Sequence, residues 1–445
     1  MRLVEVLKNA FKVKDLRKKI GMTLLLVIIF RIGCFITVPG LQDAALDSLA
    51  GNGLFKFMDM LSGGAFQQVS IFSLGISPYI NASIIMQLLT VAIPFLEKKQ
   101  KDPDGRKQLS QWTRYASIGL GLLQAVMLYF NINNEATTIN LFAAPGKFDL
   151  FTFLLMIITF TAGTAALMWL GEKITEVGIG NGISMIIFAG IISAGPRAAI
   201  SLYDIVVSGD IFGKWYFNIF VAIAILVVFL AVIVAVVWME GGERRIPVQY
   251  AKKVVGNKVY GGQSTHIPLK VNSSGVLPII FAMSLLQFPA TIVAFLGKSG
   301  QTKGFAGFIN SFSAGDSWGY VIVYALLIVG FTFFYNIVYF DPVDISNNLK
   351  KNGGFIPGLR PGAPTADFIK KSSHRITWFG AIFLAVLAVF PTVIQLICSL
   401  FNSDLGSINL WFGGTTVLIL VGVALETVRQ IEAQLLMRNY RGFLD

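Results

Sequence analysis

The feature that most constrains this chain is a series of ten apolar stretches, because a helix that crosses a bilayer needs about 20 mostly apolar residues. The stretches are approximately 22–38, 74–96, 115–132, 151–170, 183–200, 215–238, 275–296, 318–339, 376–400 and 409–426. Only 13% of the 445 residues are charged, whereas soluble proteins carry about 25%. The sequence therefore predicts an all-α polytopic membrane protein with ten transmembrane helices.

Basic residues are distributed unevenly between the two sets of connecting segments. Alternate segments hold 29 and 6 of the 36 lysines and arginines, and Arg31 lies inside the first span. Because basic loops remain in the cytoplasm, and an even number of spans puts both termini on one side, both termini are expected to be cytoplasmic. The chain is therefore expected to be a multi-pass protein of the cytoplasmic membrane, with loops 239–274 and 341–375 on the cytoplasmic side.

Two spans share a pattern at an offset of 200 residues. Gly75, Pro78, Ile80, Ala82 and Gln87 recur as Gly275, Pro278, Ile280, Ala282 and Gln287. The pattern pairs span two with span seven, as expected for two inverted, pseudo-symmetric halves (spans 1–5 and 6–10) around a central path. The expected parts are a cytoplasmic N-terminus 1–21, an N-terminal half 22–200, an external hinge 201–214, a C-terminal half 215–426 and a cytoplasmic tail 427–445.

The spans contain few residues that could support coupled transport, metal binding or catalysis. Coupled transporters usually place acidic or histidine relays within their spans, whereas the apolar cores here contain only Arg31. The two cysteines and two histidines do not have metal-ligand spacing, so neither a metal site nor another cofactor is expected. A membrane enzyme is not expected either, because no catalytic pair lies at membrane depth. A secondary transporter of a small solute stays as the disfavoured alternative.

Two long loops differ from ordinary connectors. Residues 243–253 alternate apolar and polar side chains before a Gly-Gly pair, which predicts a projecting hairpin. Residues 347–364 contain four glycines and three prolines around Arg360, which predicts a defined, non-helical shape. The apolar residues Phe355, Ile356 and Leu359 in that loop favour a role in docking a partner, and a large ribonucleoprotein is among the candidates.

Two further patterns each have two interpretations. Ile76 and Ile80, and likewise Ile183 and Ile187, lie one helical turn apart. They are either packing residues or part of an apolar constriction that excludes water and ions. Residues 53–70 are apolar at helical spacing but too short to span, so they form either a re-entrant helix or an external amphipathic helix.

Several longer motifs make the chain resemble the SecY family of bacterial protein-export channels along nearly its full length. They are Phe30–Gly33, Phe72–Ile80, Trp169–Thr175, Gly178–Ser184, Gln263–Asn272, Asn348–Lys351, Phe355–Gly362 and Phe412–Gly414. The resemblance implies a channel that passes unfolded secretory polypeptides across the membrane and releases membrane-protein spans sideways into lipid through a lateral gate between spans two and seven.

The resemblance also implies roles for particular residues. A pore ring falls on Ile76, Ile80, Ile183, Ile187, Ile280 and Ile419. A short re-entrant plug helix at about 54–66 would seal the channel, with Phe57, Met60, Leu61, Ser62, Gly63 and Gly64 as its central residues. Gln87, Thr90, Gln124 and Asn272 resemble the polar cluster of the lateral gate.

The partners follow from the same resemblance. Arg244, Arg245 and Arg360 are the candidates for contact with the ribosome or with a SecA-like motor ATPase. Small membrane subunits similar to SecE and SecG would complete the complex. Signal sequences, nascent polypeptides and membrane lipid are the expected molecules at the gate.

Overall fold

The computed structural model describes residues 3–38, 59, 62–134, 149–208, 215–250, 253–255, 258–260, 264–294, 317–401 and 414–441. The helices are α1 (Leu3–Lys12), α2 (Lys14–Gly33), α5 (Ser77–Ala92), α6 (Pro94–Lys101), α7 (Pro103–Asn134), α8 (Leu150–Val177), α9 (Gly182–Ser208), α10 (Trp215–Gly241), α11 (Leu277–Ala294), α14 (Trp318–Tyr339), α15 (Pro342–Lys351), α16 (Ala363–Phe401) and α18 (Gly414–Arg441). The strands are β1 (Glu243–Tyr250), β2 (Lys253–Val255), β3 (Lys258–Tyr260), β4 (Ser264–Lys270) and β5 (Gly354–Phe355).

Each of the ten apolar stretches overlaps at least one of these helices, and several helices extend beyond the apolar part. Helix α7 already begins at Pro103, α16 begins at Ala363, and α18 continues to Arg441. Hydropathy marks only the part of a helix that can lie in hydrocarbon, and a helix with polar side chains can continue into water. The stretches therefore locate the helices but not their ends.

Four helices in the described part of the chain are individually long and apolar enough to cross a membrane. They are Leu150–Val177, Ala222–Gly241, Trp318–Lys351 and Ala363–Ile397. Helices α5 and α6 would form a fifth span together, but they meet at a bend of 105°. The stretch 74–96 is therefore not one straight helix, because Ile93, the residue before Pro94, has an extended backbone.

The first predicted span ends earlier than expected. Helix α2 stops at Gly33, and the residues after it pair with the chain that precedes α5. Val38 N donates to Val69 O at 2.9 Å, and Ile71 N donates to Ile36 O at 2.9 Å. The segment that follows α2 is thus held beside residues 69–71 by backbone hydrogen bonds.

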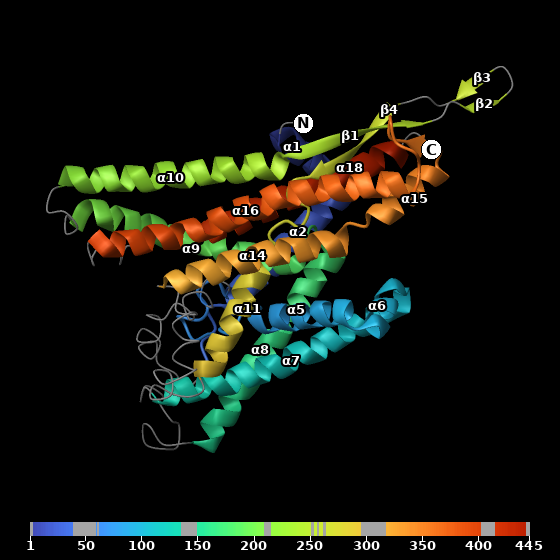
Figure 1. The fold of residues 1–445 in the computed structure, drawn as a ribbon. Helices are drawn as coiled ribbons and strands as arrows, with labels where there is room; N and C mark the ends of the chain where they lie inside the picture. The colour runs from blue at the N-terminus through green and yellow to red at the C-terminus, as the bar shows by residue number, and fades with distance from the viewer. Residues whose placement is uncertain are drawn as a thin grey trace.

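The helices pack as two sets that meet along two seams. Helices α2, α5, α7, α8 and α9 contact one another, and so do α10, α11, α14, α16 and α18. One seam lies where α5 and α7 meet α11, and the other where α9 meets α10 and α18. In Figure 1, α11 crosses the molecule next to α5, and both chain ends lie toward the end from which β1 and β4 project, here called the sheet end.

The two long loops combine into one sheet. Strand β1 pairs antiparallel with β4 and, on its other side, with β5 from the second loop, which gives the order β4-β1-β5. Strands β2 and β3 form a separate two-stranded sheet, visible at the tip of the projection in Figure 1. The predicted hairpin is therefore present.

The prediction of an entirely non-helical second loop was wrong at both ends. Its first residues belong to α15 and its last two begin α16, which leaves 352–362 as the non-helical part. Ile356 is buried with Ile246 and Val248 of β1, and Leu359 packs against the same cluster. These apolar residues therefore stabilise the sheet itself, and they are not by themselves evidence for a partner.

Candidate functional site

The six isoleucines of the predicted pore ring come from four helices that line the two seams. Ile76 and Ile80 lie at the start of α5, Ile183 and Ile187 in α9, Ile280 in α11 and Ile419 in α18. Five of them are 0–3% exposed and belong to one hydrophobic cluster, and Ile183 is partly buried and packs against it. Residues more than 300 positions apart in the chain thus belong to one buried core that includes helices of both sets.

The described part of the predicted plug is residue 59 and residues 62–66. Together with residues 67–70, residues 62–66 form a compact, turn-rich segment, here called the seal segment (residues 62–70). Ser62 Oγ donates to Asp59 O at 3.1 Å and accepts from Phe66 N at 3.2 Å, while Ser73 Oγ donates to Ala65 O at 3.1 Å. Gly63 and Gly64 have φ angles of +71° and +85°, which favour glycine. Of the predicted plug residues, Phe57, Met60 and Leu61 lie outside the described residues.

The seal segment packs against the start of α5. A Cβ atom placed on Gly75 would lie 3.3 Å from Ser62 Cα, so the two backbones approach closely. Gly75 is one residue from Ile76, which is fully buried in the isoleucine cluster. The seal segment and the isoleucines are therefore neighbouring parts of one buried region.

The polar residues assigned to the gate do not form a single cluster. Gln87 of α5 accepts a hydrogen bond from the hydroxyl of Tyr335 in α14 at 2.8 Å, and this bond joins the two sets of helices. The hydroxyl of Thr90 donates to Met86 O within α5. Gln124 lies in α7, which packs on α5, and its Oε1 is buried without a hydrogen-bond partner among the described residues.

Asn272 has different neighbours from the other three. Its Nδ2 donates to Glu240 Oε1 at 2.6 Å and to Gly275 O at 3.0 Å, which ties the end of α10 to the start of α11. Arg429 of α18 lies 3.8 Å from the same carboxylate and also donates to Glu240 O. These residues line a hollow of about 490 Å³ between α9, α10, α11 and α18. Sequence reasoning missed Tyr335 and Arg429, because only the fold brings them to these positions.

The arginines assigned to docking are all exposed on the sheet end. Arg245 is paired with Glu243 on β1 at 2.7 Å. Arg244 and Arg360 form no ion pair with any residue that the structure describes. Arg360 O accepts a hydrogen bond from the Thr365 hydroxyl at 2.8 Å, which fixes the backbone of the loop at the start of α16.

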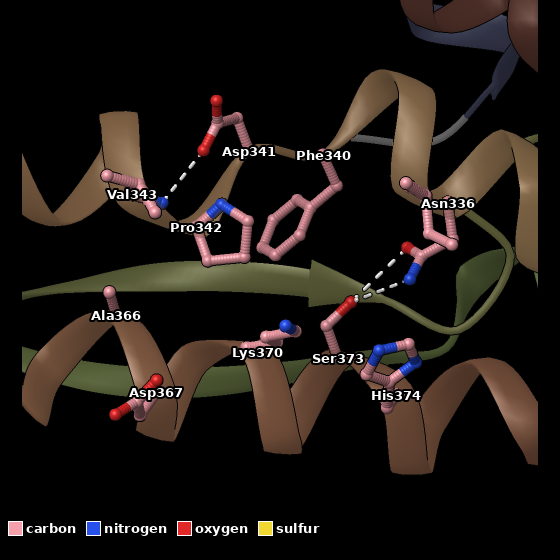
Figure 2. A pocket seen from close by; sticks show the side chains of 11 residues that line it. Asn336, Phe340, Asp341, Pro342, Val343, Ala366, Asp367, Lys370, Ser373 and His374 are labelled. Carbon is pink, nitrogen blue, oxygen red and sulfur yellow. Dashed lines mark hydrogen bonds between the residues drawn. The ribbon is translucent and has the colours of Figure 1, made fainter. Parts of the chain in front are cut away.

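A pocket of about 350 Å³ lies beside the second loop, where α14, α15 and α16 meet. Figure 2 shows Phe340 and Lys370 facing its interior, with Asn336 and Ser373 joined by hydrogen bonds of 3.2 Å on one wall. The carboxylate of Asp341 accepts from Val343 N at 2.8 Å and so caps α15. The acidic and basic side chains that line the pocket come from neighbouring helix ends. None of the residues that line the pocket belongs to the isoleucine cluster.

The fold and this site define a polytopic helical membrane protein with a buried apolar junction between two sets of helices. The family profile for SecY matches residues 70–428. The protein translocase subunit SecY of Streptomyces scabiei is 45% identical to this chain, over 98% of each sequence. The chain belongs to the SecY family, and the resemblance seen in the sequence is confirmed.

Solved structures share the fold. A structure of a SecY protein, described as showing that its plug domain stabilises the closed state of the translocation channel and maintains a membrane seal, aligns with a TM-score of 0.63 and 20% identity. The alignment covers 94% of this chain and 92% of that one. Canine Sec61 from a ribosome-channel complex aligns with a TM-score of 0.60 and 18% identity, over 94% of this chain and 92% of that one. These matches confirm the predicted fold class.

Proposed function

We propose that this chain is the protein-conducting channel of a translocase, and that the isoleucine cluster is the constriction through which an unfolded polypeptide passes. The gathering of the six isoleucines from both sets of helices supports this most directly. Branched apolar side chains offer water and ions no hydrogen bonds, so a narrow ring of them resists ion flow. A sliding polypeptide meets no fixed polar partner there. The chain thus acts as a channel subunit and not as an enzyme.

The pore assignment can be tested by conductance. Replacing Ile80 and Ile280 together with Ser should raise resting ion conductance in planar bilayers, because polar side chains stabilise water in the constriction. Export of a model precursor should continue. The matched control replaces Ile158 and Ile322, which are 64% and 58% exposed, and should leave conductance unchanged. Conductance at the wild-type level, even in a chain that also lacks residues 57–64, would identify the two isoleucines as packing residues.

The α5–α11 seam is the proposed lateral gate, through which signal sequences and membrane-protein spans reach lipid. The hydrogen bond between Gln87 and Tyr335 supports this, because the seam has to break it to open. Gln124 and Thr90 provide further polar groups near the seam. Asn272 contributes from the other side by fixing the start of α11.

The sheet end is the proposed docking face, on the cytoplasmic side, for a ribosome or a motor ATPase. The exposed Arg244 and Arg360 support this, together with the excess of lysine and arginine in the same loops. The similarity of the fold to a channel taken from a ribosome complex is consistent with it. SecE-like and SecG-like subunits are proposed to complete the assembly.

Substitutions of Arg360 test both the orientation and the docking. Arg360→Cys should react with a membrane-impermeant maleimide in inverted vesicles but not in intact cells. Arg360→Glu should leave the amount of protein in the membrane near normal and weaken motor-driven export severalfold, because the exposed guanidinium supports no span. Lys371→Glu, an exposed charge reversal on α16, is the control. Labelling from the opposite side would refute the orientation, and loss of the protein itself would show that Arg360 is structural.

A further inference from the structure

Arg31 is the one charged residue inside the first apolar stretch (22–38), and the channel function described above does not use it. It lies in the last turn of α2 and is only half buried. A charge within a membrane span is costly, and it normally persists only where it has a specific partner. The group that Arg31 binds therefore indicates why the charge is present in this span.

The guanidinium of Arg31 binds the seal segment. Its Nη1 donates to Gly63 O at 2.7 Å, and the Phe35 ring lies 5.5 Å from the centre of the guanidinium. Ser193 Oγ, in α9, lies within hydrogen-bond distance of the same carbonyl at 3.2 Å and donates to Gly190 O at 2.6 Å. One backbone carbonyl of the seal segment thus faces donors from two helices.

The backbone of the seal segment is also pressed against α9 at this point. A Cβ atom on Gly63 would lie 2.7 Å from Gly190 Cα and 2.9 Å from Arg31 Nη1. Together with a φ of +71°, this leaves room only for glycine. The carbonyl of Gly63 is therefore held at a defined distance from Arg31.

The other hydrogen bonds of the seal segment are mostly internal. Those of Ser62, Gly64 and Phe66 join residues at most five positions apart, so they can persist when the segment moves as a unit. The bonds of Arg31 and Ser193 span 32 and 130 positions and have to break when it moves. The segment has further links to the chain around and after the end of α2, because Val38 N donates to Val69 O at 2.9 Å and Cys34 Sγ lies 3.6 Å from Ser62 O. Arg31 contributes a charged donor to these long-range contacts.

We propose that Arg31 is the latch, that is, the residue whose hydrogen bond holds the seal segment in its closed position. Ser193 has one hydroxyl proton, which it shares between Gly190 O and Gly63 O, so it is a second and weaker donor. Arg31 acts as a positioning residue: a charge-assisted hydrogen bond to Gly63 O stabilises the closed arrangement, and displacement of the segment breaks that bond. The proposal rests on the proposed channel function and deepens it by naming the contact that sets how easily the seal opens.

The test measures resting conductance of the full chain in planar bilayers. Arg31→Met should increase the frequency of leak openings on the order of tenfold or more, because a hydrogen bond to a charged group is lost. Arg31→Lys keeps the charge but not the reach of the guanidinium and should give a smaller increase, as should Ser193→Ala. The matched control is Arg114→Met, which removes a guanidinium paired with Glu172 at 2.7 Å, away from the seal segment; it should not leak.

A second readout uses Cys34, which is buried with its Sγ 3.6 Å from Ser62 O. In a Cys398→Ser background, Arg31→Met should speed maleimide labelling of Cys34, because the segment that covers the thiol leaves more often. A merely structural role would lower the amount of protein or its thermal midpoint without this selective labelling.

A chain without residues 57–64 separates the two hypotheses. If the deletion raises conductance and Arg31→Met adds nothing to it, the arginine acts through the seal segment. If Arg31→Met raises conductance further in the chain that already lacks those residues, or leaves both conductance and Cys34 labelling of the full chain at the wild-type level, the latch is refuted. If the deletion itself does not raise conductance, the segment is not a seal and the latch is refuted, whereas the proposed channel function is still tested separately by the replacement of Ile80 and Ile280.

Discussion

Helices α5 and α11 start from the same backbone geometry, yet different groups surround the two starts. Gly75 and Gly275 have φ angles of +58° and +61°. Ile80 N donates to Ile76 O at 3.1 Å, and Ile280 N donates to Val276 O at 3.2 Å. In both helices a proline follows three residues after the glycine, where a missing N–H costs little.

The surroundings of the two glycines differ in kind. A Cβ on Gly75 would touch Ser62 of the seal segment, whereas a Cβ on Gly275 would meet nothing within 4 Å. The start of α11 is instead tied by Asn272 to the end of α10, next to the root of the sheet. The repeated sequence thus specifies the backbone of a helix start, while other segments place one start against Ser62 and tie the other to the end of α10.

Gly75→Ala should have the larger effect of the two substitutions. A left-handed φ costs an alanine about 1–2 kcal/mol, and displacement of Ser62 adds about 1 kcal/mol. We expect the free energy of unfolding to fall by about 2–3 kcal/mol in total, visible as a lower thermal midpoint in detergent. Resting conductance should rise as well, because the displaced Ser62 belongs to the seal segment.

A glycine elsewhere provides the control for Gly75→Ala. Gly119 lies in α7 with nothing within 4 Å of its Cβ position and has no left-handed φ. Gly119→Ala should therefore be neutral or slightly stabilising, since alanine is the better helix former. If Gly75→Ala lowers stability without raising conductance, the start of α5 supports the fold and not the seal.

The helix positions could be predicted from the sequence, but the contacts between distant segments could not. Ten apolar stretches are sufficient to place ten helices, because burial in hydrocarbon requires both length and apolarity. The pairing of β5 with β1 depends on two loops about 100 residues apart, and no local pattern shows it. For the same reason Ile356 suggested an external partner, although it is buried in the sheet's own core.

The candidate site was predicted in part. The isoleucines could be named from the motifs of the family, and all six belong to or pack against one hydrophobic cluster, but their role as a pore ring stays a prediction. The partner of Arg31 could not be named from the sequence, because it is the backbone carbonyl of Gly63. Every residue has such a carbonyl, so the residue type does not show which one binds Arg31. The hydrogen bond of Tyr335 could not be predicted either, since a single tyrosine in an apolar span does not indicate which helix its side chain faces.

Gly275→Ala should have a smaller effect than Gly75→Ala. The difference between the two substitutions tests the contact with Ser62, which Gly75 makes and Gly275 does not. The left-handed φ again costs about 1–2 kcal/mol, but no neighbour has to move, and Gly275 O can still accept from Asn272. We therefore expect a small drop in thermal midpoint and no change in resting conductance. Gly330→Ala in α14, with nothing within 4 Å and no left-handed φ, should cause no drop at all. Equal losses of stability and equal leaks in Gly75→Ala and Gly275→Ala would show that backbone strain alone accounts for both substitutions, and that the contact between Gly75 and Ser62 contributes nothing to the seal.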